Sequence, residues 1–191
     1  MPIHKQLSGI ILAILAAVFS VPAASQATTL ARLSLGQLAG AADAVARVRC
    51  AGAESHWENG SIWTVTTFDV VESMKGNLPA RMTVRVPGGR VGHLIVTVDG
   101  TPKFNAGDDS IVFLVSSRAG GFSVAGWVEG TFRIALDPRT RRETVTQDSS
   151  AFAVFDAATR SFKAEGIRRM PIEQFRARVA AAITRTEEKT R

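Results

Sequence analysis

Few residues of this chain have side chains that do chemistry, and their spacing forms no known catalytic set. His56 lies in the polar run ESHWE at residues 54–58, where an imidazole and two carboxylates are of metal-ligand types. Successive residues of a turn seldom converge on one ion, so we interpret this run as a solvated hairpin tip and predict no metal site. His93 follows Gly92, and neither histidine belongs to a recognisable motif with a serine or cysteine nucleophile. We therefore predict no catalytic residues and no cofactor.

The first 27 residues have the pattern of an export signal. Lys5 precedes the apolar run GIILAILAAVFSV at residues 9–21, which is short for a membrane span. Small residues predict cleavage after Ala27, with cleavage after Ser25 and an uncleaved membrane anchor as the alternatives. No cysteine lies directly after the apolar run, which argues against lipoprotein processing. The sequence thus predicts a periplasmic or extracellular protein with no stable membrane insertion after cleavage.

The composition of the mature chain fits one domain held together by its core. Removing 27 of the 191 residues leaves 164, enough for one domain of sizeable core. The net charge falls from +6 to +5 because Lys5 is lost, and such a surface tolerates anionic partners without requiring them. The single cysteine, Cys50, excludes an intrachain disulfide. Because Cys50 alternates with Ala46 and Val48 along an expected strand, we predict that it is a small core residue.

Tryptophans and arginines are the other residues that suggest binding. The set comprises Trp57, Trp63, Trp127, Arg47, Arg49, Arg81 and Arg85. These residue types can form a stacking and charged surface for nucleic acid, but export argues against that partner. Trp and Arg are also enriched at the hot spots of protein interfaces. We therefore expect Trp63 or Trp127 in the core, the arginines on a solvated strand face, and a protein as the partner.

The chain from residue 34 to residue 146 is predicted to form one short helix and then a series of strands. Ser34 is a good N-cap for a helix at residues 34–42. Strands at residues 43–51 and 62–71 are expected to form a hairpin, because Asn59-Gly60 is a strong turn signal at the end of the loop 54–60. Further strands are expected at residues 81–86, 93–99, 109–117, 122–128, 130–136 and 142–146.

Two further segments complete the expected architecture. Residues 87–92, PGGRVG, lead into a strand, whereas a phosphate-binding loop leads into a helix, so we interpret this run as a bend or bulge. Residues 147–167 are predicted to be a long loop with one candidate strand at 151–155. Pro171 opens a helix, and residues after 184 are expected to be frayed. The apolar stripe of this helix, which we expect to pack on the β-domain, consists of Ile172, Phe175, Val179 and Ile183.

Several short motifs occur in an order that is similar to a known family. They are Ala42-Asp43-Ala44-Val45, Met74-Lys75-Gly76, Gly88-Gly89, Phe104-Asn105-Ala106-Gly107-Asp108 and Gly126-Trp127-Val128. This order, over residues 39–136, resembles netrin-like domains, including the amino-terminal domain of tissue inhibitors of metalloproteinases, and also exported, uncharacterised bacterial proteins with the same pattern. The resemblance implies a closed five-stranded barrel of OB type with extra strands and helices around it. Tissue inhibitors chelate the protease zinc through an amino-terminal cysteine, but here the predicted mature start is Thr28, so that mechanism does not carry over.

These observations predict a mainly β protein, a small closed or partly open antiparallel barrel of OB or netrin-like type with a short N-terminal helix and a C-terminal amphipathic helix. The expected divisions are a signal peptide (1–27), a β-barrel domain (28–146), and a loop and helix packed on it (147–191). We expect a non-enzymatic module that binds another exported protein, such as a protease. A glycan-associating envelope protein and a hydrolase built around His56 or His93 are the alternatives. The expected partner-binding surface consists of residues of the loops 54–60 and 87–92 together with the first residue of the strand that follows: His56, Trp57, Glu58, Asn59, Arg90 and His93.

Overall fold

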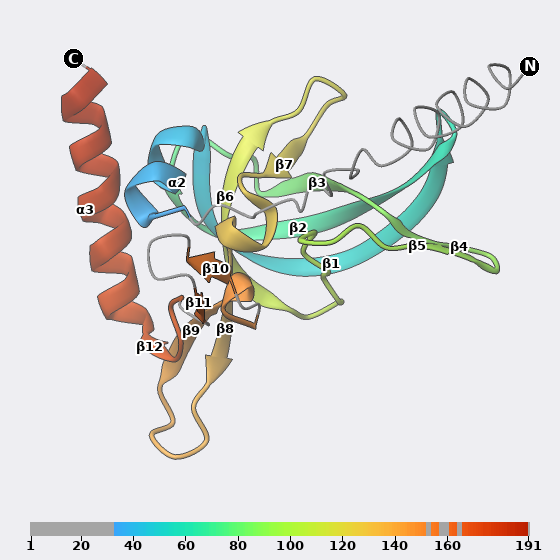
Figure 1. Ribbon diagram of the computed structural model, residues 1–191. Coiled ribbons are helices and arrows are strands. Elements are labelled where there is room, and N and C mark those ends of the chain that lie inside the picture. Colours follow the sequence, from blue (N-terminus) through green and yellow to red (C-terminus); the bar gives the residue numbers. More distant parts are fainter. Residues whose placement is uncertain (1–32, 152–153, 157–160, 164–165, 191) are drawn as a thin grey trace, which may run out of the picture. The chain divides into compact units, whose positions relative to one another are not determined.

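The computed structural model describes residues 33–151, 154–156, 161–163 and 166–190 (Figure 1). All of these residues belong to one compact unit, Ala31–Arg191. The predicted signal peptide, residues 1–27, lies outside the described residues. Within the described residues, no helix combines the length and the apolar character that crossing a bilayer requires.

The unit begins with the short helix α2 (Leu35–Ala41), which is closed at its N-terminus by a capping box. The Oγ of Ser34 accepts a hydrogen bond from the backbone N–H of Gln37, and the Gln37 side chain accepts one from the backbone N–H of Ser34. These reciprocal bonds satisfy backbone donors that a helix start leaves unpaired. The predicted helix and its N-cap are therefore confirmed.

A long antiparallel hairpin, β1 (Ala44–Glu58) with β2 (Ser61–Lys75), dominates the sheet. Asn59 and Gly60 connect the strands, and both have positive φ, 49° and 79°. This conformation is the two-residue hairpin turn that Asn-Gly favours. The predicted hairpin is confirmed, but the predicted loop at residues 54–60 is wrong, because residues 54–58 pair with β2 right up to the turn.

The remaining elements extend this hairpin into a mainly β structure. In the described part of the chain, one sheet has the order β1-β2-β3-β7-β6-β8-β9-β12, while β4-β5 and β10-β11 form two-stranded sheets. The strands that follow β2 are β3 (Arg81–Pro87), β4 (Gly89–Val91), β5 (Leu94–Val96), β6 (Asp109–Ser116), β7 (Phe122–Val124), β8 (Thr131–Leu136), β9 (Glu143–Gln147), β10 (Val154–Asp156), β11 (Ser161–Lys163) and β12 (Met170–Pro171). The helices are the 3-10 turns η1 (Trp127–Gly130) and η2 (Asp148–Ala151) and the α-helix α3 (Ile172–Thr190).

Strand β1 also pairs with β6, so the strand pairing returns to its starting point. The circuit runs β1-β2-β3-β7-β6 and back to β1, and its contacts are antiparallel except for the parallel pair β3–β7. Strand β6 is buried on both of its faces, which explains its continuous apolar sequence. Val112 and Leu114 pack with one cluster of buried residues, and Ile111 and Phe113 pack with another.

Two hydrophobic clusters form the core on the two sides of β6. The ring core combines side chains of the five paired strands with Phe104. The helix-side core joins α2 and α3 to β1, β6, β8 and β9, so the stripe predicted for α3 is confirmed. Its largest fully buried side chains are Leu38, Ile111, Phe113, Phe132 and Phe175.

Four local predictions were wrong. His93 lies in the turn between β4 and β5, so the expected strand 93–99 shrinks to Leu94–Val96 and the expected bend at 87–92 contains β4. The expected strand 122–128 ends at Val124, because Gly126 and Trp127 have positive φ and start the 3-10 turn η1. Helix α3 continues to Thr190, although we expected fraying after residue 184.

The predicted long loop at residues 147–167 is also corrected in its described parts. It contains the 3-10 turn η2 and the hairpin β10–β11. The candidate strand at 151–155 corresponds to β10, which begins later, at Val154. Residues 152–153, 157–160 and 164–165 lie outside the described residues. This stretch of sequence is rich in Ser and Ala, which gave no period from which a hairpin could be predicted.

Truncation of Phe175 should separate α3 from the core. Phe175 is fully buried, and its ring centroid lies 4.7 Å from that of Phe132. We expect Phe175→Ala to lower the free energy of unfolding by about 3–5 kcal/mol, since it leaves a cavity under the helix. Urea denaturation of the mature chain measures this loss. The neighbouring, exposed Gln174→Ala is the control and should change stability by less than about 0.5 kcal/mol, so equal losses would contradict the docking of α3.

Cys50 should be unreactive in the native protein. Its side chain is only 2% exposed, and burial raises the pKa of the thiol, which lowers the fraction of reactive thiolate. We expect a thiol reagent such as 5,5′-dithiobis(2-nitrobenzoate) to label the folded mature chain slowly and the chain in guanidinium chloride at once. Rapid stoichiometric labelling under native conditions would show that Cys50 is accessible.

Candidate functional site

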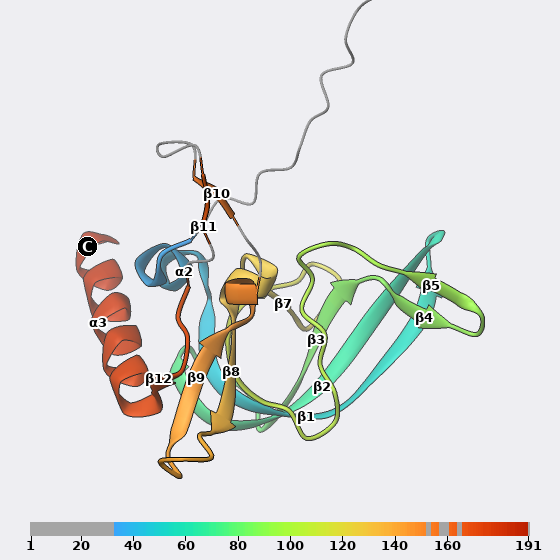
Figure 2. The ribbon, with the colours of Figure 1, turned by 60° about the horizontal axis from the view of Figure 1, so that its bottom comes forward.

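The structure brings the two predicted segments of the binding surface to the same end of the β1–β2 hairpin. Figure 2 shows β4 and β5 beside that end, and β4 contacts both β1 and β2. The backbone N–H of Arg90 donates to Ser55 Oγ at 3.2 Å. A Cβ at Gly89 would lie 2.3 Å from both Ser55 Oγ and Thr64 Oγ1, so this crossing requires glycine.

Glu58 does not point freely into solvent as a hairpin-tip residue would. Its carboxylate lies 2.8 Å from Arg85 Nη1 and 3.3 Å from His56 Nε2. The hydrogen bond from Arg85 is the main reason that the pKa of Glu58 is lowered. The guanidinium of Arg85 also lies 4.1 Å from the ring centroid of Trp63. Glu58 therefore connects β1 to β3 across β2 and is mainly structural.

The two histidines of the predicted surface do not form a site together with other ligating side chains. His93 is exposed in the β4–β5 turn, whereas His56 is exposed on β1 and contacts Glu58. Among the described residues, no group of three or more His, Cys, Asp or Glu side chains is arranged to hold a metal ion. Both histidines are exposed surface residues.

The main feature of this surface is apolar, and of its residues only Trp57 was predicted from the sequence. Trp57, Leu94, Ile95 and Val96 are exposed by 50%, 56%, 65% and 40%, and we call these four residues the apolar tip. Trp57 and Ser55 share one face of β1, and Ser55 contacts β4, so Trp57 lies on the side of the hairpin that β4 crosses. The run Leu94-Ile95-Val96 is typical of a buried strand, and sequence periodicity cannot show that nothing covers it.

Strand β5 offers one unpaired edge at the apolar tip. Within the described residues β5 pairs with β4 alone, in the register Val91↔Leu94 and Arg90↔Ile95 around a two-residue turn. Val91 and Leu94 close this turn as a hydrogen-bonded pair, so the next pair is not hydrogen-bonded and the N–H and C=O of Ile95 face outward. The N–H of Arg90 likewise faces away from β5 and reaches Ser55.

A cavity of about 300 Å³ lies beside the apolar tip, and we call it the hairpin cavity. Its walls come from β2, from the end of β3, from β4 and β5, and from the segment that follows β5. The lining contains two cations and no carboxylate. The lining residues are Thr64, Thr66, Val86, Pro87, Gly88, Gly89, Arg90, Ile95, Val96, Thr97, Val98, Thr101, Pro102, Lys103 and Phe104.

The arginines expected on a solvated strand face divide into two kinds. Arg49 and Arg81 are exposed, with side chains 62% and 67% accessible. Arg47 and Arg85 are largely buried, at 13% and 16%, so the prediction was wrong for them. Strand alternation assigns a face, but the acidic partners that allow burial of an arginine come from other strands.

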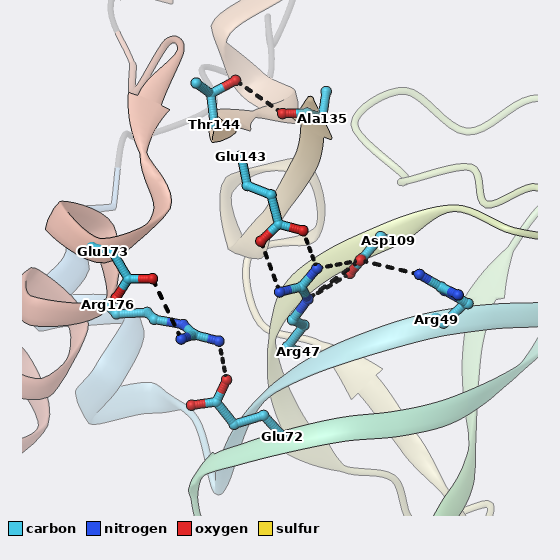
Figure 3. A network of polar contacts seen from close by, with 9 residues as sticks. All are labelled: Arg47, Arg49, Glu72, Asp109, Ala135, Glu143, Thr144, Glu173 and Arg176. Carbon is cyan, nitrogen blue, oxygen red and sulfur yellow. Dashed lines mark hydrogen bonds and ion pairs between the residues drawn. The ribbon is translucent and has the colours of Figure 1, made fainter. Parts of the chain in front are cut away.

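Arg47 is the centre of a network of ion pairs (Figure 3). Its Nη2 lies 2.6 Å from Asp109 Oδ2 and 2.7 Å from Glu143 Oε1, while Nε donates to Asp109 Oδ1 at 3.0 Å. These hydrogen bonds raise the pKa of Arg47 above its usual range. The two carboxylates come from β6 and β9, so one guanidinium joins three strands. Beside it, Arg176 of α3 pairs with Glu72 of β2.

Comparison of the chain with protein-family models, with curated proteins and with solved structures found no match.

Replacing Arg47 should cost far more stability than replacing an exposed arginine. Arg47→Met keeps much of the side-chain length but leaves Glu143 without its arginine and Asp109 with only the longer, 3.7 Å pair to Arg49. We expect a loss of about 3 kcal/mol in the free energy of unfolding, measured by urea denaturation. The control is Arg81→Met, whose exposed pair with Asp69 should contribute less than about 1 kcal/mol. Losses of the same small size in both variants would contradict a structural role for the network.

Proposed function

We propose that this chain is an exported, non-enzymatic module that binds another exported protein through the apolar tip. The observation that carries the proposal is the exposure of four large apolar side chains at one end of a well-packed structure. Grouped apolar exposure of this kind marks interaction surfaces, whereas single exposed apolar residues are ordinary. Trp57 adds a residue type that is enriched at interface hot spots.

The proposed occupant is an extended segment of the partner that adds a strand to β5. The outward N–H and C=O of Ile95 supply main-chain hydrogen bonds, and the exposed side chains of Leu94 and Val96 supply contacts beside them. Proteins protect exposed strand edges with charges, proline or a covering segment, but β5 carries three apolar residues. Arg90 lies on β4 beside β5, which favours a partner segment that carries acidic residues.

We also infer that the circuit β1-β2-β3-β7-β6 is a barrel of OB type, as the resemblance to netrin-like domains implies. Five strands and a pairing that returns to β1 support this inference. So does the Greek-key order, in which β6 returns after a long connection to lie beside β1. A secreted protease is one candidate partner, bound at the apolar tip and not through the amino-terminal residue Thr28.

The proposal is tested by affinity capture from the native envelope and culture fluid, with the mature chain from residue 28 as bait and mass spectrometry as readout. The test variant carries Trp57→Ser and Leu94→Ser, and the control carries Leu136→Ser, an equally exposed residue on β8. We expect the wild type and the control to capture the same partner in similar amounts. The double variant should capture about tenfold less of it.

A second pair of variants tests the strand-addition geometry. Ile95→Pro and Ile95→Ala both shorten the side chain, but only proline removes the outward N–H of β5. We expect Ile95→Pro to lose more of the captured partner than Ile95→Ala. The proposal is overturned if no captured protein is bound less by the double variant than by the control. It is also overturned if all variants bind equally to purified cell-wall polysaccharide.

A further inference from the structure

The hairpin cavity has features of a small-molecule site that the proposed protein-binding function does not use. Its volume of about 300 Å³ is at the lower end of ligand pockets, and its lining is mostly apolar with a few polar groups. Ile95 and Val96 of the apolar tip line the cavity, whereas Trp57 and Leu94 do not. Variants of Trp57 and Leu94 can therefore test the tip without changing the cavity lining.

One wall of the cavity is held rigid by aromatic and cationic contacts. The ring of Phe104 packs edge-on against Phe68, with centroids 4.9 Å apart, and the guanidinium of Arg133 lies 4.6 Å from the Phe104 ring centroid. Arg133 also donates from Nη2 to the backbone oxygen of Lys103. Phe104 and Pro102 are buried, so this wall does not depend on a ligand for its position.

The opposite wall is fixed by backbone contacts at the end of β3. Gly88 donates its N–H to the Ile62 oxygen at 2.8 Å and accepts a hydrogen bond from Thr64 Oγ1 at 2.7 Å. Gly88 has a φ of 90°, and a Cβ there would lie 2.7 Å from the Val96 oxygen, so glycine allows β5 to approach this closely. The cavity is thus bounded by preformed walls, which lowers the entropic cost of binding.

Both charged side chains that line the cavity are basic. Arg90 and Lys103 line it from two different segments, both are exposed, and no Asp or Glu is part of the lining. Valine, isoleucine, proline and phenylalanine side chains form most of the remaining wall. An anionic head at the rim with an apolar body inside would satisfy both parts of this lining.

We propose that the hairpin cavity binds a small anionic amphiphile, a carboxylate carried by a compact aliphatic body. The apolar body lies against Val86, Val98 and Phe104, and the carboxylate is held by Lys103 and Arg90. The site shares Arg90, Ile95 and Val96 with the strand-addition surface, but Val86, Val98, Lys103 and Phe104 belong to the cavity alone.

The test uses octanoate as the probe and the full mature chain as the protein. Binding is followed by isothermal titration calorimetry and by amide chemical shifts of the cavity residues. We expect saturable octanoate binding with shifts centred on residues 97–104, and clearly weaker binding of octanol and of octylammonium, which lack the negative charge. Raised salt should weaken octanoate binding and leave octanol unaffected, since salt screens the exposed charges.

Substitutions in and outside the cavity lining test where octanoate binds. We expect Lys103→Gln to weaken octanoate binding about fivefold, the effect of one exposed ion pair, while Arg118→Gln, an exposed arginine outside the lining, changes nothing. Thr97→Trp places bulk on an exposed lining residue and should abolish binding while the circular dichroism spectrum stays native. The double variant Trp57→Ser, Leu94→Ser should bind octanoate normally.

Three results would overturn this inference: no saturable octanoate binding, equal binding of octanol, or loss of binding in the Trp57→Ser, Leu94→Ser variant, which would place the probe on the apolar tip. Each of these results leaves partner capture by the tip unchanged, so failure of the cavity site is distinguishable from failure of the protein-binding function. Loss of partner capture with normal octanoate binding would overturn the protein-binding function and leave the cavity site standing.

Discussion

The double pairing of β1 is the constraint on which the other elements depend. Its first residues are hydrogen-bonded to β2 on one edge and to β6 on the other, over the pairs Ala44↔Leu114 to Arg49↔Asp109. Irregularities in the β1–β2 register occur in this same part of the strand, where bulges increase twist and bend the sheet. Beyond residue 52 the register is regular and β1 pairs with β2 alone, so the far half of the hairpin leaves the core.

Arg47 lies where β1, β6 and β9 meet, and its charge makes this junction specific. A guanidinium that is 13% exposed is costly unless it is paired, and here Asp109 and Glu143 both receive hydrogen bonds from it. The same strands separate the two hydrophobic clusters, because β6 contributes one face to each. Apolar packing supplies most of the stabilisation, while the ion pairs connect β1 with β6 and β9.

The apolar tip and the β5 edge lie where the ring core ends, and the hairpin cavity lies beside them. Residues of the ring core and of the helix-side core are buried. The β4–β5 hairpin instead contacts the far half of the β1–β2 hairpin, and Leu94 to Val96 stay exposed. Gly88 and Gly89 permit two close backbone approaches there, one to β5 and one to Ser55 and Thr64. A rigid scaffold that carries an apolar tip and a preformed cavity is suited to recognition, since little order has to be gained on binding.

The sequence by itself determined the features that depend on neighbouring residues. The N-cap at Ser34, the Asn59-Gly60 turn, the alternation of β3 and the apolar stripe of α3 all follow from local backbone preferences and periodicity. Trp57 and Arg90 were also identified in the sequence as surface residues near one another.

Only the tertiary structure decided which faces are covered. The burial of Arg47 depends on Asp109 and Glu143, which are 62 and 96 residues away in sequence. The exposure of Leu94-Ile95-Val96 and the hairpin cavity arise because β4 crosses the hairpin at Ser55, a contact between distant segments. Local pattern gives each side chain a direction, but burial and charge pairing depend on what the rest of the chain places opposite it.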